Sequence, residues 1–334
     1  MSGIWSYIGR RLVITLLILL AVSFTVYVIF ALLPYDPASL TCGKNCNNPG
    51  IIAANRVRLG YDKPFYVQYW LFLVGLFLGR HFGVGAAAIY CPAPSFGYSF
   101  NQHACVTDLL SQAIPVTIYL AIGALILWMI VGVGLGIISA KFKGKIWDTL
   151  STAFVLVGTS LPTFLTGLVL IVFLVIDLPW SPFPSDGYTP PEEDFLAFIL
   201  SMFLPWVTLA FAYAAIYTRF VRSQILEIST EDYIRTARAK GLSDRVILAK
   251  HTMRAAWAPI ITMAGLDFAG LLGGAILTEA VFNLPGMGRL SLTAVVNIDL
   301  PVIVATTIVA AAIVVVMNMI LDIAYAFIDP RVRV

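Results

Sequence analysis

The sequence predicts an all-α polytopic membrane protein, and three observations support that fold class. Of its 334 residues, 60% are hydrophobic and only 12% are charged, about half the charged share of an average globular chain. The mean hydropathy is +0.90. Long apolar stretches of about 20 residues, the length that crosses a bilayer, recur along the chain. The net charge of +3 is too small to indicate a nucleic-acid partner, so we expect none.

Six of these stretches predict six transmembrane helices. They cover residues 12–33, 116–140, 150–176, 195–218, 257–282 and 302–328. The first follows Arg10 and Arg11, as a secretory signal would, but it is too long for a signal-peptide core and is not followed by a small-residue cleavage site. We therefore predict that residues 1–33 hold a retained N-terminal anchor helix.

A seventh apolar stretch, residues 65–79, is short enough to be either a span or a surface helix. The positive-inside rule decides between these alternatives, because cytoplasmic loops are enriched in Lys and Arg. If residues 65–79 do not cross, most of the Lys and Arg fall on the same side of the membrane as the two termini. The sequence thus predicts six spans with both termini cytoplasmic, and an extracytoplasmic domain over residues 34–115.

All four cysteines lie in that predicted outer domain: Cys42, Cys46, Cys91 and Cys105. An even number of cysteines in one exported loop indicates a disulfide framework. The simplest of the three possible connectivities pairs each cysteine with its neighbour in sequence. A metal site that recruits His81 and His103 is the alternative, which the wide spacing of the last two cysteines disfavours. We predict structural disulfides and no metal site.

Residues 219–256 form a long segment on the predicted cytoplasmic side. Ser229 is followed by Thr-Glu-Asp, which is typical of a helix start, because acids in the first turn favour the helix dipole. Lys240 followed by Gly241 is typical of a helix end. A second short helix, capped by Ser243, is predicted to run through Lys250. The segment is either a compact knob that another surface approaches or a solvated hairpin.

A few polar residues interrupt the last two spans. Asp267 lies in the middle of the fifth, where a charge is costly unless it faces water or a partner, so it is a candidate for a solute path. Glu279 lies near the outer end and either joins that path or reaches the interface. Asn318 and Asp322 share one face of the sixth span and predict an interhelical hydrogen bond. Asp299 is a candidate cap for the same span.

Several ordered motifs resemble those of importer-type ABC transporter permeases. The run RTA-x-x-x-G is similar to the EAA loop, through which such permeases dock on their ATPase; its residues are Arg235, Thr236, Ala237, Arg238, Ala239, Lys240 and Gly241. The surrounding EDYIRTARAKGL and the later H-x-x-R resemble the dipeptide and oligopeptide permease branch. So do LPYDP from Leu33, LGYDKPF from Leu59 and TEAVFNLPGMGR from Thr278. The resemblance covers nearly the whole chain.

The resemblance implies a type I ABC importer permease fold, with a core permease domain at residues 116–328, the coupling loop at 219–256 and a cytoplasmic tail at 329–334. It also implies a bacterial plasma-membrane location. The implied partners are a second homologous permease subunit, two ATP-binding subunits or one fused pair, and an extracytoplasmic solute-binding protein that delivers di- or oligopeptides. The implied mechanism is alternating access, driven by ATP and Mg bound to the partner subunits, with no cofactor in this chain.

Other classes of function fit the sequence less well. The chain has no G-x-x-x-x-G-K-[ST] motif of its own, so it is predicted not to hydrolyse ATP. The three histidines are scattered and do not form the H-E-x-x-H pattern of a metalloprotease. A channel filter of the TVGYG type is also absent from the sequence. Two alternatives stay open: the same architecture importing nickel chelates or another small solute, and a stand-alone secondary carrier.

Overall fold

The computed structural model describes residues 2–31, 49–59, 62–83, 88–178, 180–184 and 187–328. The chain is mostly helical, as predicted, and divides into two compact units. Unit 1 contains Met1–Thr117, Leu272–Ile276 and Pro285–Val334, and unit 2 contains Ile118–Leu271 and Leu277–Leu284.

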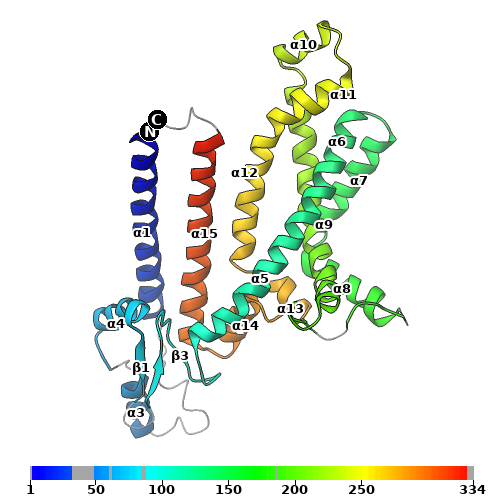
Figure 1. Cartoon of the computed structure of the whole chain (residues 1–334). Coiled ribbons are helices and arrows are strands. Elements are labelled where there is room, and N and C mark those ends of the chain that lie inside the picture. Colours follow the sequence, from blue (N-terminus) through cyan, green and yellow to red (C-terminus); the bar gives the residue numbers. More distant parts are fainter. Residues whose placement is uncertain are drawn as a thin grey trace. The chain divides into compact units, whose positions relative to one another are not determined.

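Unit 1 combines long helices with two small hairpins. Its elements are α1 (Ser2–Ala31), α3 (Pro49–Leu59), α4 (Phe65–Leu78), the first half of α5 (Val106–Trp128), α14 (Met287–Val296) and α15 (Leu300–Ile328). The antiparallel hairpins are β1 (Arg80–Phe82) with β2 (Ile89–Cys91), and β3 (Tyr98–Ser99) with β4 (Ala104–Cys105). Helices α1 and α15 run side by side (Figure 1).

Helix α4 shows how the ambiguous stretch at 65–79 is used. At 14 residues it is about 21 Å long, shorter than the roughly 30 Å hydrocarbon core of a bilayer. Its Phe72 is buried against Val26 of α1 and Ile308 of α15. The Tyr69 hydroxyl lies 2.9 Å from the Ser23 hydroxyl of α1. The length and packing of α4 therefore agree with the prediction that this stretch does not cross the membrane.

A disulfide between Cys91 and Cys105 ties the two hairpins of unit 1 together. Both sulfurs are buried, and Phe82 and Tyr98 pack around them. This bond confirms the predicted pairing of the last two cysteines. The other predicted pair, Cys42 with Cys46, lies outside the described residues.

Unit 2 is built around its longest helix, α9 (Phe195–Ile228). The other elements are the second half of α5, η3 (Met129–Val133), α6 (Gly134–Lys141), α7 (Ile146–Ser160), α8 (Thr163–Ile171), η4 (Val172–Ile176), α10 (Asp232–Ala239), α11 (Asp244–Val246), η5 (Ile247–Thr252), α12 (Met253–Leu272) and most of α13 (Ile276–Val281).

Close helix packing around α9 depends on small residues. A Cβ added at Gly136 of α6 would lie 2.7 Å from the Val221 Cβ, and one added at Gly158 of α7 would lie 2.6 Å from the Ala215 Cβ. Backbones approach closely at such positions, as they do in membrane helix bundles. The start of α9 is capped by the Asp194 carboxylate, which accepts hydrogen bonds from the backbone N–H groups of Leu196 and Ala197.

The described residues contain five helices long and apolar enough to span a membrane, or six if a bent pair counts as one span. The bent pair is α7 with α8 and η4, and it replaces the straight third span predicted at 150–176. The helix direction bends by 98° between its two arms, after Leu161, whose backbone is extended. The cause is Pro162, because a proline pushes the residue before it out of the helical conformation.

Three predicted boundaries also move. Helix α5 starts at Val106, so the predicted loop domain 34–115 overlaps its beginning. Helix α9 continues past residue 218 to Ile228. The predicted fifth span, 257–282, is instead a helix that runs from Asp244 to Leu272, followed by the short α13. Hydropathy locates the apolar part of each helix, whereas the helices continue into polar sequence.

Candidate functional site

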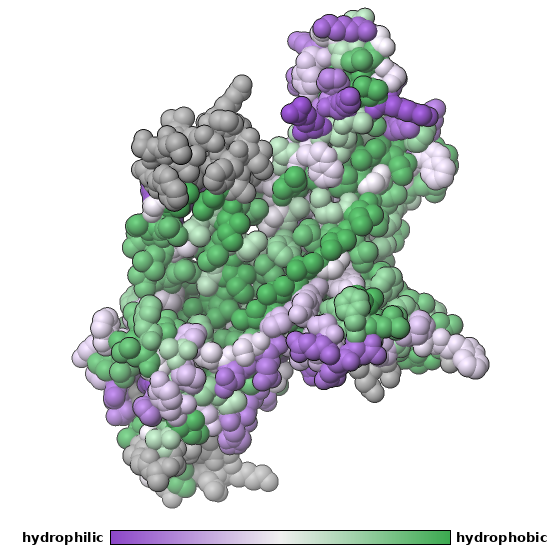
Figure 2. Space-filling view, viewed as in Figure 1, coloured by the Kyte–Doolittle hydropathy of each residue, from purple (hydrophilic) through white to green (hydrophobic). Residues whose placement is uncertain are grey.

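The resemblance directs attention to α10, which stands at one tip of unit 2 (Figure 1). Its underside is apolar: Ile234 and Ala237 are buried against Ile247 of η5, with Ile228 of α9 beside them. Its other face is polar, and hydrophilic residues gather over this tip while the helices below it present an apolar surface (Figure 2). We call residues 232–241 the knob.

The end of the knob at Gly241 is a Schellman motif. The Leu242 N–H donates to the Ala237 carbonyl, and the Gly241 N–H donates to the Arg238 carbonyl. Gly241 has a φ of +80°, in the left-handed region that glycine tolerates best. No atom lies within 4 Å of a Cβ built there, so glycine is needed for the backbone conformation and not for space. The predicted helix end at Lys240 and Gly241 is confirmed.

The polar face of the knob carries exposed, weakly paired charges. Arg235 lies 3.6 Å from Asp232, and Arg238 lies 3.6 Å from Asp244, with all four side chains more than half exposed. Exposed pairs of this kind contribute little to stability. The prediction of a second short helix ending at Lys250 is wrong, because this segment is continuous with α12. The knob therefore rests directly on the start of a long helix.

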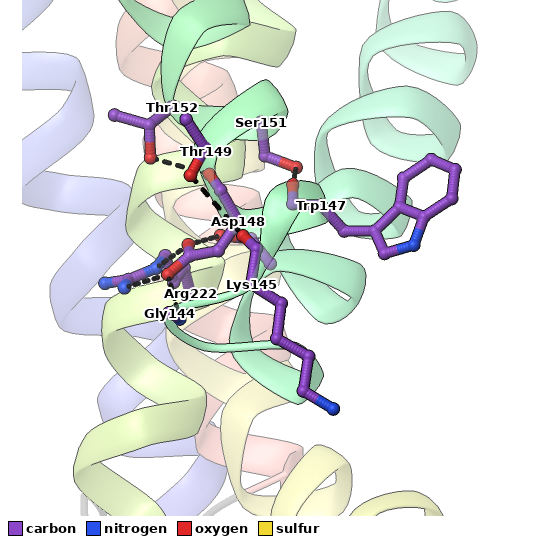
Figure 3. Close-up of polar contacts among 9 residues, drawn as sticks. Gly144, Lys145, Trp147, Asp148, Thr149, Ser151, Thr152 and Arg222 are labelled. Atoms are coloured by element: carbon purple, nitrogen blue, oxygen red, sulfur yellow. Dashed lines mark hydrogen bonds and ion pairs between the residues drawn. The ribbon is translucent and has the colours of Figure 1, made fainter.

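A charge network around the buried Asp148 lies in the same unit as the knob, where the α6–α7 turn meets α9 (Figure 3). The Asp148 carboxylate accepts hydrogen bonds from Arg222 Nε at 2.8 Å and Arg222 Nη2 at 2.9 Å. The Ser139 hydroxyl donates to it at 2.6 Å and the Gly144 N–H at 2.9 Å. This bidentate geometry fixes orientation as well as charge. The network ties the α6–α7 turn to α9.

Sequence reasoning missed this network, although each half had a signal. Asp148 stands in the first turn of α7, where the helix dipole favours an acid. Arg222 lies beyond the predicted end of the fourth span, in a segment predicted to be loop, and the structure places it on the continuing α9. Nothing in the linear sequence indicates that two residues so far apart in the chain are partners.

The predicted path acids differ in their surroundings. Asp267 of α12 is half-buried, and it accepts a 2.7 Å hydrogen bond from the hydroxyl of Tyr217 on α9. Tyr213 lies one turn before Tyr217 on α9, and the ring of Trp128 on α5 stacks on it. Glu279 is completely buried, so the expectation that it reaches the interface is wrong.

The polar pair of the sixth span behaves in two ways. Asp322 of α15 forms a 2.8 Å ion pair with Arg11 of α1, so it does connect two helices. Asn318 does not, since its Oδ1 is buried without a hydrogen-bond partner in the described part of the chain. Both residues lie on α15, four positions apart, as predicted. The predicted contact between helices is found only for Asp322.

Asp299 caps α15, as predicted, because its carboxylate accepts a hydrogen bond from the Val302 N–H. The Ser99 hydroxyl of β3 donates to the same carboxylate. Burial raises the pKa of Asp299, and the two hydrogen bonds partly oppose that rise. The contact anchors a hairpin of unit 1 to the start of α15.

Two protein-family models match this chain. Residues 132–334 match the model for the binding-protein-dependent transport system inner membrane component, and residues 4–121 match the model for its N-terminal region. The chain therefore belongs to this family, whose members are the membrane permease subunits of ABC importers.

Individual relatives match over almost their whole length. A probable peptide ABC transporter permease, y4tP of Sinorhizobium fredii, is 36% identical over 98% of this chain and 99% of its own. The glutathione transport system permease GsiC of Salmonella typhimurium is 34% identical over 98% of this chain and 99% of its own. A solved chain of the MetNI methionine ABC transporter covers 65% of this chain and 96% of its own, with 20% identity and a TM-score of 0.49.

Proposed function

We propose that this chain forms half of the translocation path of an ATP-driven importer for di- or oligopeptides. Membership of the permease family supports the import role. The substrate class is supported by relatives that are called peptide and glutathione permeases, since glutathione is itself a small peptide. The chain covers 99% of the length of both relatives.

The observation that carries the proposal is the knob. It presents exposed polar groups on one side and anchors its apolar side on η5 and the end of α9. We infer that a separate ATPase subunit receives it through Arg235, Thr236, Ala237, Arg238, Ala239, Lys240 and Gly241. ATP and Mg are then bound by that partner, because this chain has no phosphate-binding loop motif of its own.

Movement of the knob has a physical route into the bundle. Ile234 and Ala237 pack on Ile247, at the start of the helix that becomes α12. The Asp148–Arg222 pair connects the adjoining α9 to the α6–α7 turn. Closure of the ATPases would therefore shift α9, α12 and the α6–α7 hairpin together. This coordinated shift is the alternating access that we propose.

The proposed complex contains a second homologous permease, forming a heterodimer, two ATPase subunits or one fused pair, and an extracytoplasmic solute-binding protein. The knob and both termini are cytoplasmic, in a bacterial plasma membrane. The basic residues of 219–256 support this orientation through the positive-inside rule. The Cys91–Cys105 disulfide supports an oxidising outer location for residues 34–115.

Asp267 is the path residue that the geometry favours. It is half-buried on a candidate span and held by the hydroxyl of Tyr217, so it can face a water-filled cavity while keeping one protein partner. Glu279 was the other candidate. Its complete burial favours a role in packing, because no surface of the described chain exposes its carboxylate.

Purification of the complex through a tag on this chain tests the proposal. We expect an ATPase and a second permease to co-purify, and proteoliposomes supplied with the binding protein to import labelled dipeptides only with ATP. Uptake of a nickel chelate but no peptide would overturn the substrate class. Uptake by the single chain without ATP would indicate a secondary carrier and overturn the importer mechanism.

A further inference from the structure

A groove opens beside the knob, between α10 and the start of α12. Three of its lining residues are cationic in type, Lys250, His251 and Arg254, and two are aromatic, Tyr233 and Trp257. Its remaining lining residues are alanines, so no carboxylate is among the described residues that line it. The H-x-x-R motif of the sequence, His251 to Arg254, thus lines a concave surface, and the proposed docking of the knob does not use it.

Three arginines of unit 2 outside the groove have acidic partners. Arg222 is bound to Asp148, and Arg235 and Arg238 each have an acidic neighbour. In the described ranges, no ion pair or side-chain hydrogen bond engages the side chains of Lys250, His251 and Arg254. Unneutralised positive groups that converge on one concavity favour an anionic ligand.

The surface beyond the cations indicates which kind of anion fits. Arg254, Trp257 and Ile261 follow the i, i+3, i+7 spacing of one helix face, and they lead from the groove onto α12. Trp257 is 40% exposed and Ile261 is 49% exposed. A cationic end followed by an aromatic and then an aliphatic side chain matches a molecule with a charged head and an apolar tail. Tryptophan also favours the boundary between bilayer and water.

We propose that the groove binds an anionic phospholipid of the membrane leaflet at the knob end. Lys250 and Arg254 contact the headgroup phosphate, His251 and Tyr233 lie beside it, and an acyl chain follows Trp257 and Ile261. Basic pockets next to membrane helices commonly hold such headgroups. The other occupant of matching charge, an acidic segment of an ATPase, would leave the apolar continuation along α12 uncovered.

The test uses the complete transporter, incubated with equal amounts of phosphatidylglycerol and phosphatidylcholine and measured by native mass spectrometry. We expect the double substitution Lys250→Gln with Arg254→Gln to lower the ratio of phosphatidylglycerol to phosphatidylcholine adducts roughly tenfold. The matched control, Lys143→Gln with Arg245→Gln, removes the same charges from exposed positions outside the groove and should leave the ratio nearly unchanged.

Equal losses in both double variants would overturn the proposal, because they would indicate general surface attraction. An unchanged adduct ratio together with loss of ATPase co-purification in the groove variant would also overturn it, in favour of an acidic protein partner. Neither result would affect the proposed role of the knob in import.

A second measurement needs no substitution. A photoactivatable phosphatidylglycerol added to the unmodified transporter should label peptides that contain residues 250–261 in preference to the exposed apolar face of α7 at Leu156 and Val157. Equal labelling of the two helices would contradict a specific site.

Discussion

The two units each connect their helices with an ion pair, and the two pairs differ in their surroundings. Both have a nitrogen to oxygen distance of 2.8 Å. In unit 1, the Arg11 and Asp322 side chains are each 36% exposed. In unit 2, Asp148 is only 11% exposed and also accepts hydrogen bonds from Ser139 and Gly144. The two ion pairs therefore constrain their helices differently despite equal nitrogen to oxygen distances, because burial and additional donors decide how rigidly a pair holds its helices.

The two ion pairs also differ in their position relative to the proposed coupling route. The buried pair joins α7 to α9, the helix whose end packs against the proposed coupling knob. A loose connection there would transmit less of the movement of the knob to α7. The half-exposed pair joins α1 to α15. Neither helix belongs to the proposed route of coupling. We therefore expect disruption of the two pairs to have unequal effects, and unit 1 to depend more on its disulfide and on Asp299.

The largest effect should come from Arg222→Gln, which leaves the Asp148 carboxylate buried without its cation. We expect the thermal midpoint of the purified protein to fall by roughly ten degrees, and ATP consumption per imported peptide to rise in whatever protein remains folded. The control Asp322→Asn should shift the midpoint much less, since half-exposed pairs contribute about 1 kcal/mol or less. Equal midpoints for the two variants would remove the distinction between the pairs.

The next effect concerns the disulfide of unit 1. Replacing Cys91 and Cys105 with serine should lower the free energy of unfolding by about 3 kcal/mol, the value expected for a loop of this size. ATP consumption per imported peptide should stay the same, because the bond lies outside the coupling route. Thermal unfolding and mass spectrometry of non-reduced peptides check this. Free thiols at both positions in the wild-type protein would refute the bond.

A smaller energetic change with a larger functional consequence is expected at Gly241. Valine there must adopt a left-handed backbone at a cost of about 1–3 kcal/mol, which should deform the knob while the protein remains inserted. We expect ATP-dependent uptake to fall roughly tenfold or more. Asparagine tolerates this conformation better and should retain more uptake.

The helical Gly134 provides the control, since a Cβ there also meets nothing within 4 Å. Its φ of −58° suits any residue, so Gly134→Ala should import normally. Normal uptake by Gly241→Val would count against the knob as the coupling element.

The smallest effect is a pH dependence in unit 1. Burial raises the pKa of Asp299, so the folded state holds this proton more tightly than the unfolded state. The stability contributed by Asp299 is therefore greatest below the ordinary carboxyl pKa of about 3.9, and it declines as the pH rises from there through the raised pKa. Relative to Asp299→Asn, the wild-type thermal midpoint should fall over that range. A difference that stays constant with pH would contradict the burial effect.

Much of the fold could be predicted from the sequence because apolar stretches and local caps are written in consecutive residues. The six stretches and the helix end at Gly241 are of this kind. The Cys91–Cys105 bond follows from the simplest connectivity, which pairs cysteines that are neighbours in sequence. Hydropathy shows that a stretch is apolar but not the direction of its helix axis. It therefore did not reveal the bend after Leu161, although Pro162 provided a local signal.

The remaining features depend on tertiary contacts. The Asp148–Arg222 pair joins residues 74 positions apart, and Arg222 lies where α9 continues beyond its apolar part. The groove likewise combines Tyr233 of α10 with residues of η5 and α12. Such partners are brought together by the packing of whole helices, which no local pattern encodes.

The central claim is that the knob contacts an ATPase, and site-specific photo-crosslinking in intact membranes tests it most directly. A photoreactive residue in place of Leu242, which is 39% exposed beside the knob, should crosslink to an ATPase subunit. The same probe in place of Tyr90, which is 51% exposed in β2 of unit 1, should not. Crosslinks to the ATPase from both positions, or from neither, would contradict the account.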